Sequence, residues 1–363
     1  MYSNLYNIVI MNNINYRLYK LEFNSRLKNF YRFFNVIGEN YSETDVLPNH
    51  MLESYKEFKA DLDRKVKELD KDIHYVEKIE KYYKLFRILD NSKIDVLAYK
   101  AILSVESNLS IKSLLEKFKP KKGYSKKIRY DTLSNVSGRL KILDGPNILT
   151  LPKRCRNIFE SRFSDGKVIS VDFVNLEPRL MLKLVNKEVS GDIYNEIKRI
   201  LDFENELDRS IIKRAVISVL YGASHESLRN ISASKAVKIF KSVKEFFEIE
   251  KLLELSLNID KHGIRRNYFG RPIWNLDETK ENILINNYIQ SSAVDVALQY
   301  FSQLTSILDL NRAVPIFLIH DAIIFDIEKE YINEFSNIIK KGYNDKDLGN
   351  FPLSTTQFNT KCD

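Results

Sequence analysis

The sequence predicts an α+β fold that is rich in helices and contains a few buried strands. Glycine and proline are scarce, 11 and 8 among 363 residues, so long helices are seldom interrupted. Long segments carry apolar residues three and four positions apart, which is the helical period. Two short apolar runs, at 167–172 and 315–325, are instead typical of strands. Most of the remaining chain is expected to be helical.

Composition limits the kinds of protein that this chain can be. Hydrophobic residues make up 44% and charged residues 29%, which excludes a disordered chain. Lysine and arginine exceed aspartate and glutamate by 57 to 49, so the net charge of +8 favours a polyanion such as nucleic acid as partner. Two cysteines and scattered histidines argue against a disulfide framework or a zinc site. With no signal peptide and no membrane span evident, we expect a reduced, cytoplasmic protein.

The first helical pattern covers residues 51–89, where Lys and Glu alternate with apolar positions. It predicts one or two long amphipathic helices. A basic run follows at 117–129, KFKPKKGYSKKIR, in which Pro120 and Gly123 exclude a continuous helix. Such a run is usually a solvated loop, but its place just before the motifs described below favours a contact with phosphates.

The strand candidates end in, or pass through, acidic residues. The run at 167–172 ends in Asp172, and a helical pattern follows directly. The run at 315–325 passes through His320 and Asp321, which predicts a β-hairpin with a polar bend. About 140 residues of mostly helical pattern separate the two runs, too many for a simple crossover. We therefore expect an inserted helical subdomain.

One helix of this insertion carries cations and an aromatic ring on a single face. Its residues at every fourth position are Arg209, Lys213, Ile217 and Tyr221. Such a face can bind a triphosphate with its first half and stack a base with its second. An ordinary amphipathic helix with surface charges is the alternative, but R-x-x-x-K followed by Tyr-Gly is much rarer than R-x-x-x-K alone.

Five segments, in this order, resemble the motifs of DNA polymerase I-like (family A) polymerases, with a secondary similarity to phage single-subunit RNA polymerases. They are SGRL with PNILTLP at 137–152, VDFVNLEPRL at 171–180, RSIIKRAVISVLYG at 209–222, NNYIQSSAVD at 286–295 and LIHDA at 318–322. NYFGRPIW at 267–274 resembles the family's G-R-R-R stretch more loosely. The resemblance covers about residues 134–325 and implies a right-hand polymerase with a helical thumb, an antiparallel-sheet palm and helical fingers.

The resemblance also implies a division of the chain. We expect thumb helices at 41–120, a palm split between 121–199 and 286–363, and fingers at 200–285. Residues 1–40 stay unassigned. The small size suggests a phage or mobile-element enzyme acting in the host cytoplasm.

Roles for individual residues follow from the same resemblance. Asp172 and Asp321, with the backbone carbonyl of Phe173, would bind two Mg²⁺ ions, for which Mn²⁺ is an alternative. Arg209 and Lys213 would bind the incoming triphosphate, and Lys213 would also neutralise the leaving pyrophosphate. The remaining site residues would surround the nucleotide or the DNA. Tyr221, Ile217 and Glu177 belong to the nucleotide site, and Arg139, Asn286, Gln290 and His320 to the DNA site.

Two departures from the family pattern bear on the choice of sugar. Ala322 replaces the family's final glutamate, and Ile217 replaces the usual aromatic residue; both are closer to the RNA polymerases. Glu177 favours deoxynucleotides, because a glutamate beneath the sugar would crowd a 2′-hydroxyl where the RNA enzymes have glycine.

Three of these residues also have simpler interpretations. Glu177 could pair with Arg179 or Lys183 on its own helix. His320 could only cap the hairpin turn, and Tyr221 could pack in the core and cap its helix.

We therefore expect a template-directed DNA polymerase that extends a primer on primer-template DNA with dNTPs. The alternatives are an RNA polymerase or primase-like enzyme and a catalytically silent DNA-binding module. Two D-x-E pairs, at 202–204 and 326–328, superficially resemble a proofreading exonuclease motif, but we interpret them as surface acids and expect no 3′→5′ exonuclease. The sequence does not say whether a helicase, primase or clamp takes part.

Overall fold

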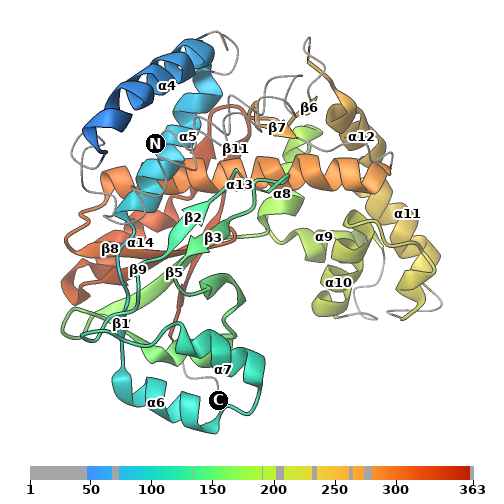
Figure 1. Cartoon of the computed structure of the whole chain (residues 1–363). Coiled ribbons are helices and arrows are strands. Elements are labelled where there is room, and N and C mark those ends of the chain that lie inside the picture. Colours follow the sequence, from blue (N-terminus) through green and yellow to red (C-terminus); the bar gives the residue numbers. More distant parts are fainter. Residues whose placement is uncertain are drawn as a thin grey trace. The chain divides into compact units, whose positions relative to one another are not determined.

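The structure is a computed structural model of the chain and describes residues 47–67, 73–133, 135–189, 191–201, 208–230, 235–260, 265–273 and 280–359 (Figure 1). The unassigned segment 1–40 lies outside these residues. Two compact units divide the chain, Met1–Glu80 and Lys81–Asp363. The division falls inside the predicted thumb, 41–120, whose limits stay a prediction.

The first unit contains α4 (Asn49–Lys67) and the beginning of α5 (Ile73–Ile88), which continues into the second unit. They lie in the stretch 51–89, for which the sequence pattern predicts one or two long helices.

The second unit begins with two short helices and the basic segment. Helices α6 (Val96–Val105) and α7 (Leu109–Glu116) are each capped at their N-termini, by the side chains of Asp95 and Asn108. Strand β1 (Lys93–Ile94) pairs with β4 (Phe159–Glu160). The basic run at 117–129 forms turns and loop with a short final strand, as its proline and glycine predict.

A four-stranded antiparallel sheet forms the centre of the second unit. Its order is β12 (Leu353–Gln357), β5 (Lys167–Phe173), β9 (Ala322–Ile327) and β8 (Ala313–Ile319). Strands β5, β8 and β9 confirm the predicted strand and hairpin.

Two helices cover one face of this sheet. The ring of Phe173 contacts Tyr300 on α13 (Glu281–Ile307), with ring centroids 5.5 Å apart. Phe325 contacts Phe335 on α14 (Ile332–Lys340), at 5.3 Å. Phe325 pairs with Ile169, four residues before Phe173, so the two rings point to the same side of the sheet. Helices α13 and α14 therefore share a face, and α13 crosses the width of the second unit in Figure 1.

The predicted helical insertion between β5 and the hairpin is also present. It contains α8 (Leu176–Leu184), α9 (Ile193–Ile200), α10 (Arg209–Leu220), α11 (Ala236–Phe246) and α12 (Ile249–Leu257). Helix α10 packs against both α9 and α11. The smaller elements are the hairpins β2 (Arg129–Asp131) with β3 (Lys141–Asp144), β6 (Arg265–Arg266) with β7 (Pro272–Ile273) and β10 (Tyr343–Asp345) with β11 (Gly349–Phe351), and the 3₁₀ helices η1 (Ile148–Thr150), η2 (Lys153–Ile158), η3 (Ser227–Asn230) and η4 (Lys329–Tyr331). Together these elements confirm the predicted α+β class.

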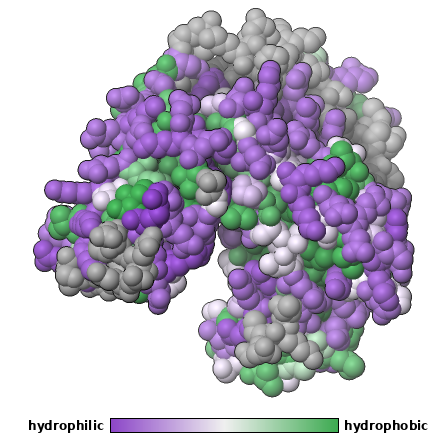
Figure 2. Space-filling model, turned by 180° about the vertical axis from the view of Figure 1, so that it is seen from behind, coloured by the Kyte–Doolittle hydropathy of each residue, from purple (hydrophilic) through white to green (hydrophobic). Residues whose placement is uncertain are grey.

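The face of the molecule that is seen from behind is mainly hydrophilic where its residues are described. Figure 2 shows charged and polar residues over most of the face seen from behind. None of the helices in the described ranges combines the length and apolarity that crossing a bilayer requires.

The interpretation of Asp326 as a surface acid is wrong. Its side chain is 1% exposed and accepts hydrogen bonds from Ser161 Oγ at 2.6 Å and Arg162 Nε at 3.1 Å. A carboxylate can be buried in this way because its charge is paired and its oxygens accept hydrogen bonds. Asp326 therefore belongs to an internal ion pair, while the other D-x-E pair, at 202–204, lies outside the described residues.

Candidate active site

One pocket of about 560 Å³ gathers most of the predicted site residues. Residues at the ends of β5 and β8, on α8, α10 and α13, and in the segment that follows β2 line this pocket. The predicted residues in its lining are Arg139, Asp172, Phe173, Glu177, Lys213, Ile217, Tyr221, Asn286, Gln290, His320 and Asp321. Among the predicted site residues only Arg209 is absent from this lining.

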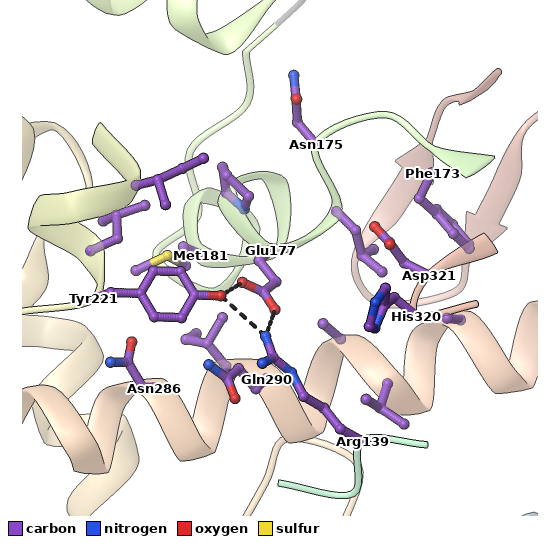
Figure 3. Close-up of a pocket in the computed structure, with 18 of the residues that line it drawn as sticks. Arg139, Phe173, Asn175, Glu177, Met181, Tyr221, Asn286, Gln290, His320 and Asp321 are labelled. Atoms are coloured by element: carbon purple, nitrogen blue, oxygen red, sulfur yellow. Dashed lines mark hydrogen bonds and ion pairs between the residues drawn. The ribbon is translucent and has the colours of Figure 1, made fainter. Parts of the chain in front are cut away.

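Backbone pairing brings the two predicted metal-binding acids together. Asp172 on β5 lies opposite Ala322 on β9, the residue that follows Asp321. The N–H of Phe173 donates to the carbonyl of Asp321, with N and O 3.4 Å apart. Figure 3 shows Asp321 beside Phe173 at the hairpin bend. Two acids that are far apart in sequence thus occupy the same end of neighbouring strands.

Both acids have pKa values above the ordinary range of an aspartate. Burial and the nearby charge of Asp321 raise the pKa of Asp172 to about 7, although Lys153 and Lys213 oppose the rise. Burial also raises the pKa of Asp321, and the negative charge of Glu177 adds to this effect. A cation placed between the two carboxylates would relieve this repulsion.

The donor set fits a hard divalent cation. Asp172 and Asp321 supply carboxylate oxygens, which Mg²⁺ prefers. Neither carboxylate forms an ion pair with any described residue. In the described part of the chain, no cluster of three or more His, Cys, Asp or Glu side chains could hold a metal ion. A metal at this site would therefore rely on the two acids, a backbone carbonyl and oxygens from water or substrate.

His320 forms the sharp bend that presents Asp321. Its backbone has a φ of +53°, in the left-handed region that residues other than glycine seldom adopt. The same residue is exposed and lines the pocket. Its turn position and its predicted place near a primer end are therefore compatible.

Helix α10 forms the opposite side of the pocket. Lys213, Ile217 and Tyr221 line it, as the spacing of four residues predicts. The Lys213 Nζ lies 5.8 Å from the centre of the Tyr194 ring, and the Arg209 guanidinium carbon lies 5.2 Å from it. Both cations are therefore within range of a favourable interaction with this ring.

Arg209 is turned toward an acid on α9. Its Nε donates to Asp192 Oδ2 at 3.0 Å, and its Nη2 also donates to Oδ2. The other oxygen of Asp192 accepts from the N–H of Asn195 and so caps α9. This ion pair explains why Arg209 does not line the pocket.

Glu177, Arg139 and Tyr221 form a hydrogen-bonded cluster across the pocket (Figure 3). Tyr221 Oη donates to Glu177 Oε2 at 2.5 Å, and Arg139 Nη2 lies 3.3 Å from Glu177 Oε1. Arg139 Nη2 also donates to Tyr221 Oη at 3.2 Å. Burial, followed by the bond to Glu177, raises the pKa of Tyr221. The cluster joins residues from three separate motifs.

The simpler interpretations of Glu177 and Tyr221 do not match these contacts. Arg179 donates to backbone carbonyls instead, including Val174 O at 3.0 Å, and Lys183 pairs with Glu188. Tyr221 does cap α10, but its side chain is 40% exposed and so does not pack in the core.

Sequence reasoning missed several residues of the site. Asp192 and Tyr194 hold the cations of α10, and Lys153 lies near enough to Asp172 to affect its pKa. Asp192 stands directly before a helix, which is a detectable capping signal. Nothing in its spacing from Arg209 reveals their contact.

Comparison with known proteins decides the family. The family model described as DNA polymerase family A matches residues 49–356. The chain belongs to DNA polymerase family A.

A solved structure supports the same fold for this family A chain. The chain is similar to the POL domain of Pol1 from M. smegmatis in complex with DNA primer-template and dNTP. The TM-score is 0.57 at 17% sequence identity, and the match covers 69% of this chain. It covers 51% of the solved chain, so this protein spans about half of that chain's length. The match confirms the predicted polymerase fold. Among curated proteins, none matches the chain.

Proposed function

We propose that this family A protein is a template-directed DNA polymerase that extends a primer 3′-hydroxyl with dNTPs. The observation that carries the proposal is the position of Asp172 and Asp321 at the same end of adjacent strands, in one pocket with Lys213. This arrangement places two hard anionic ligands opposite a cation, as phosphoryl transfer requires.

The acids suit a two-metal reaction. Asp172, Asp321 and the Phe173 carbonyl would hold two Mg²⁺ ions, with Mn²⁺ as an alternative. Such ions, when bound, stabilise charge on the attacking and leaving oxygens of an in-line displacement.

The chain's own cations serve the nucleotide. Lys213 lies in the pocket, where it neutralises charge on the leaving pyrophosphate and can donate a proton to it. Arg209 binds the triphosphate after leaving Asp192, because its planar guanidinium suits a phosphate as well as a carboxylate.

Selection of the sugar is assigned to Glu177. Its carboxylate is held from two sides, by Arg139 and Tyr221, and is therefore a fixed obstacle and not a mobile side chain. Ile217, 36% exposed, offers an apolar surface to the base.

The DNA contacts are assigned to the remaining pocket residues. Asn286 and Gln290 lie one turn apart on α13, and Arg139 and His320 line the same pocket (Figure 3). The net charge of +8 favours a DNA backbone, and primer-template DNA is the proposed partner. A helicase, primase or clamp partner, a cytoplasmic location and a phage origin stay predictions from the sequence. The proposal includes no 3′→5′ exonuclease activity.

A second candidate is an RNA polymerase or primase-like enzyme. Ala322 lies opposite Asp172 in the sheet, so this position supplies no third carboxylate, and Ile217 is not aromatic. A catalytically silent DNA-binding module is less well supported, because both acids are kept in the pocket without neutralising ion pairs.

A primer-extension assay on the purified chain tests the proposal. We expect extension with dNTPs in the presence of Mg²⁺, and none after chelation by EDTA. The same template with NTPs separates the two enzyme candidates. Faster extension with NTPs would favour the RNA polymerase, while primer-template binding without any extension would favour the silent module.

A further inference from the structure

One buried ion pair involves two residues that do not line the pocket, and none of the proposed chemical roles uses it. Arg271 and Asp295 are 3% and 0% exposed. Arg271 Nη2 lies 2.7 Å from Asp295 Oδ1, and Nε lies 3.2 Å from Oδ2. Asn267 Nδ2 donates to the same Oδ2 at 2.7 Å. Asp295 is therefore held by three donors, in a bidentate arrangement that fixes the plane of the guanidinium.

The guanidinium also binds the segment that leads to Arg139. Arg271 Nη1 donates to the carbonyl of Thr132 at 2.8 Å, and Nη2 donates to Thr132 Oγ1 at 3.3 Å. The hydroxyl of Thr132 in turn donates to the carbonyl of Gly138. A continuous chain of hydrogen bonds thus runs from α13 to the residue directly before Arg139.

The backbone of Gly138 lies directly against the side chain of Arg271. Its φ of +68° is in the left-handed region, and a Cβ at this position would lie 2.6 Å from Arg271 Cζ. Any side chain would therefore displace either the backbone or the guanidinium. Because Gly138 has no side chain, its backbone can lie against the Arg271 guanidinium, and its carbonyl can accept the hydrogen bond from the Thr132 hydroxyl.

We propose that Asp295, Arg271 and Thr132 are positioning residues for Arg139, an inference that rests on the proposed polymerase function. They hold the backbone at Gly138, so that the Arg139 side chain reaches Glu177 and Tyr221 in the pocket. Because α13 also carries Asn286 and Gln290, the same chain of bonds links two sets of proposed DNA contacts. Arg139 is thereby kept in place when a primer end enters the pocket.

A double-mutant cycle between Thr132 and Arg139 tests this inference. Thr132→Val keeps the branched shape but removes both hydroxyl bonds. We expect it to lower kcat for primer extension about tenfold, with a smaller change in the KM for dNTP, because the proposed triphosphate-binding cations Arg209 and Lys213 are not bonded to Arg139. In an Arg139→Ala background the same change is expected to alter kcat less than about twofold, since its effect acts through Arg139.

Two further variants separate positioning from a general loss of structure. Thr132→Ser restores the hydroxyl and is expected to recover near wild-type kcat. Thr305→Val is a matched control, because Thr305 is also buried and its hydroxyl bonds within α13, to Phe301 O at 2.9 Å. It is expected to leave kcat unchanged. Equal losses from Thr132→Val in the wild-type and Arg139→Ala backgrounds, or no loss from Thr132→Val, would overturn the inference.

Arg271→Lys provides an independent route if Thr132→Val does not fold. Lysine keeps the charge beside Asp295 but cannot reach Asp295 and Thr132 together, so we expect a similar loss of kcat that again disappears in the Arg139→Ala background. All variants are also compared for primer-template binding by fluorescence anisotropy. If the wild-type protein is inactive, the proposed function is rejected, but the affinity for primer-template still tests this inference. Non-additive changes in that affinity on combining Thr132→Val with Arg139→Ala would support it, and additive changes would overturn it.

Discussion

The two sides of the pocket hold their charged groups by different means. On the strand side, Asp172 and Asp321 are placed by the pairing of β5 with β9. On the helix side, Arg209 forms an ion pair with Asp192, and the side chains of Arg209 and Asp192 are 45% and 26% exposed. Paired strands fix a register along their whole length, whereas a partly exposed ion pair is weak and can exchange partners. The acids are therefore a fixed part of the site, and Arg209, beside the pocket, is an adjustable part.

Removing an acid should have the largest effect, because no neighbouring group can replace a ligand that the backbone fixes. Asp321→Asn and Asp172→Asn are each expected to reduce single-turnover extension by about a thousandfold or more. Primer-template affinity, measured by anisotropy, should change little. Asp347→Asn, an exposed acid in the loop between β10 and β11, is the matched control and should extend normally. Extension at the wild-type rate by either site variant would refute the assignment of the acids.

Removing the pocket cation of α10 should cost less. Lys213→Ala is expected to lower kcat about a hundredfold, since one charged group aimed at the leaving phosphate is lost. Lys213→Arg should recover part of the loss because it keeps the charge. Arg214→Ala, on the same helix but outside the pocket lining, is the control. Rapid-quench kinetics with saturating dNTP measures the effect, and equal losses from both alanine variants would count against a specific role for Lys213.

Changing Glu177 tests a group that is bound by two elements, by Arg139 from the segment after β2 and by Tyr221 of α10. Glu177→Gly should reduce discrimination against ribonucleotides by about tenfold or more, since the crowded space beneath the sugar opens. Glu177→Gln keeps the size and should preserve most of the discrimination. The ratio of kcat/KM for dNTP and NTP measures the effect. An unchanged ratio in the glycine variant would rule out this selection role.

The smallest effect is expected from changing the partly exposed ion pair between Arg209 and Asp192. Asp192→Asn keeps an acceptor for the cap of α9 but removes the charge that attracts Arg209. An ion pair this exposed is worth about 0.2–1 kcal/mol, so the KM for dNTP should fall by up to about fivefold. Steady-state extension measures this change. A higher KM would show instead that Asp192 directs Arg209 toward the nucleotide.

The strand side of the pocket could be predicted from the sequence because its signals are local. A short apolar run that ends in Asp172, and a second one interrupted by His320 and Asp321, are enough to place two acids at strand ends. The spacing of four residues likewise placed Lys213 and Tyr221 on one face of α10.

Contacts between distant side chains could not be predicted in this way. Asp326 was misjudged because its partner, Arg162, lies 164 residues earlier in the chain. The contact of Arg209 with Asp192 depends on how α9 packs against α10, and no periodicity records that packing. The link from Arg271 to Gly138 is hidden for the same reason, although a glycine before Arg139 is visible in the sequence.

The pairing of β12 with β5 has a consequence for how the protein is made. Ser354 lies opposite Asp172, and its hydroxyl donates to the Asp172 carbonyl across a separation of 182 residues. During synthesis this edge of β5 therefore stays unpaired until the segment at 353–357 has left the ribosome. An exposed strand edge attracts other chains. Nascent chains stalled before this segment should therefore depend on chaperones and aggregate more readily than the finished protein.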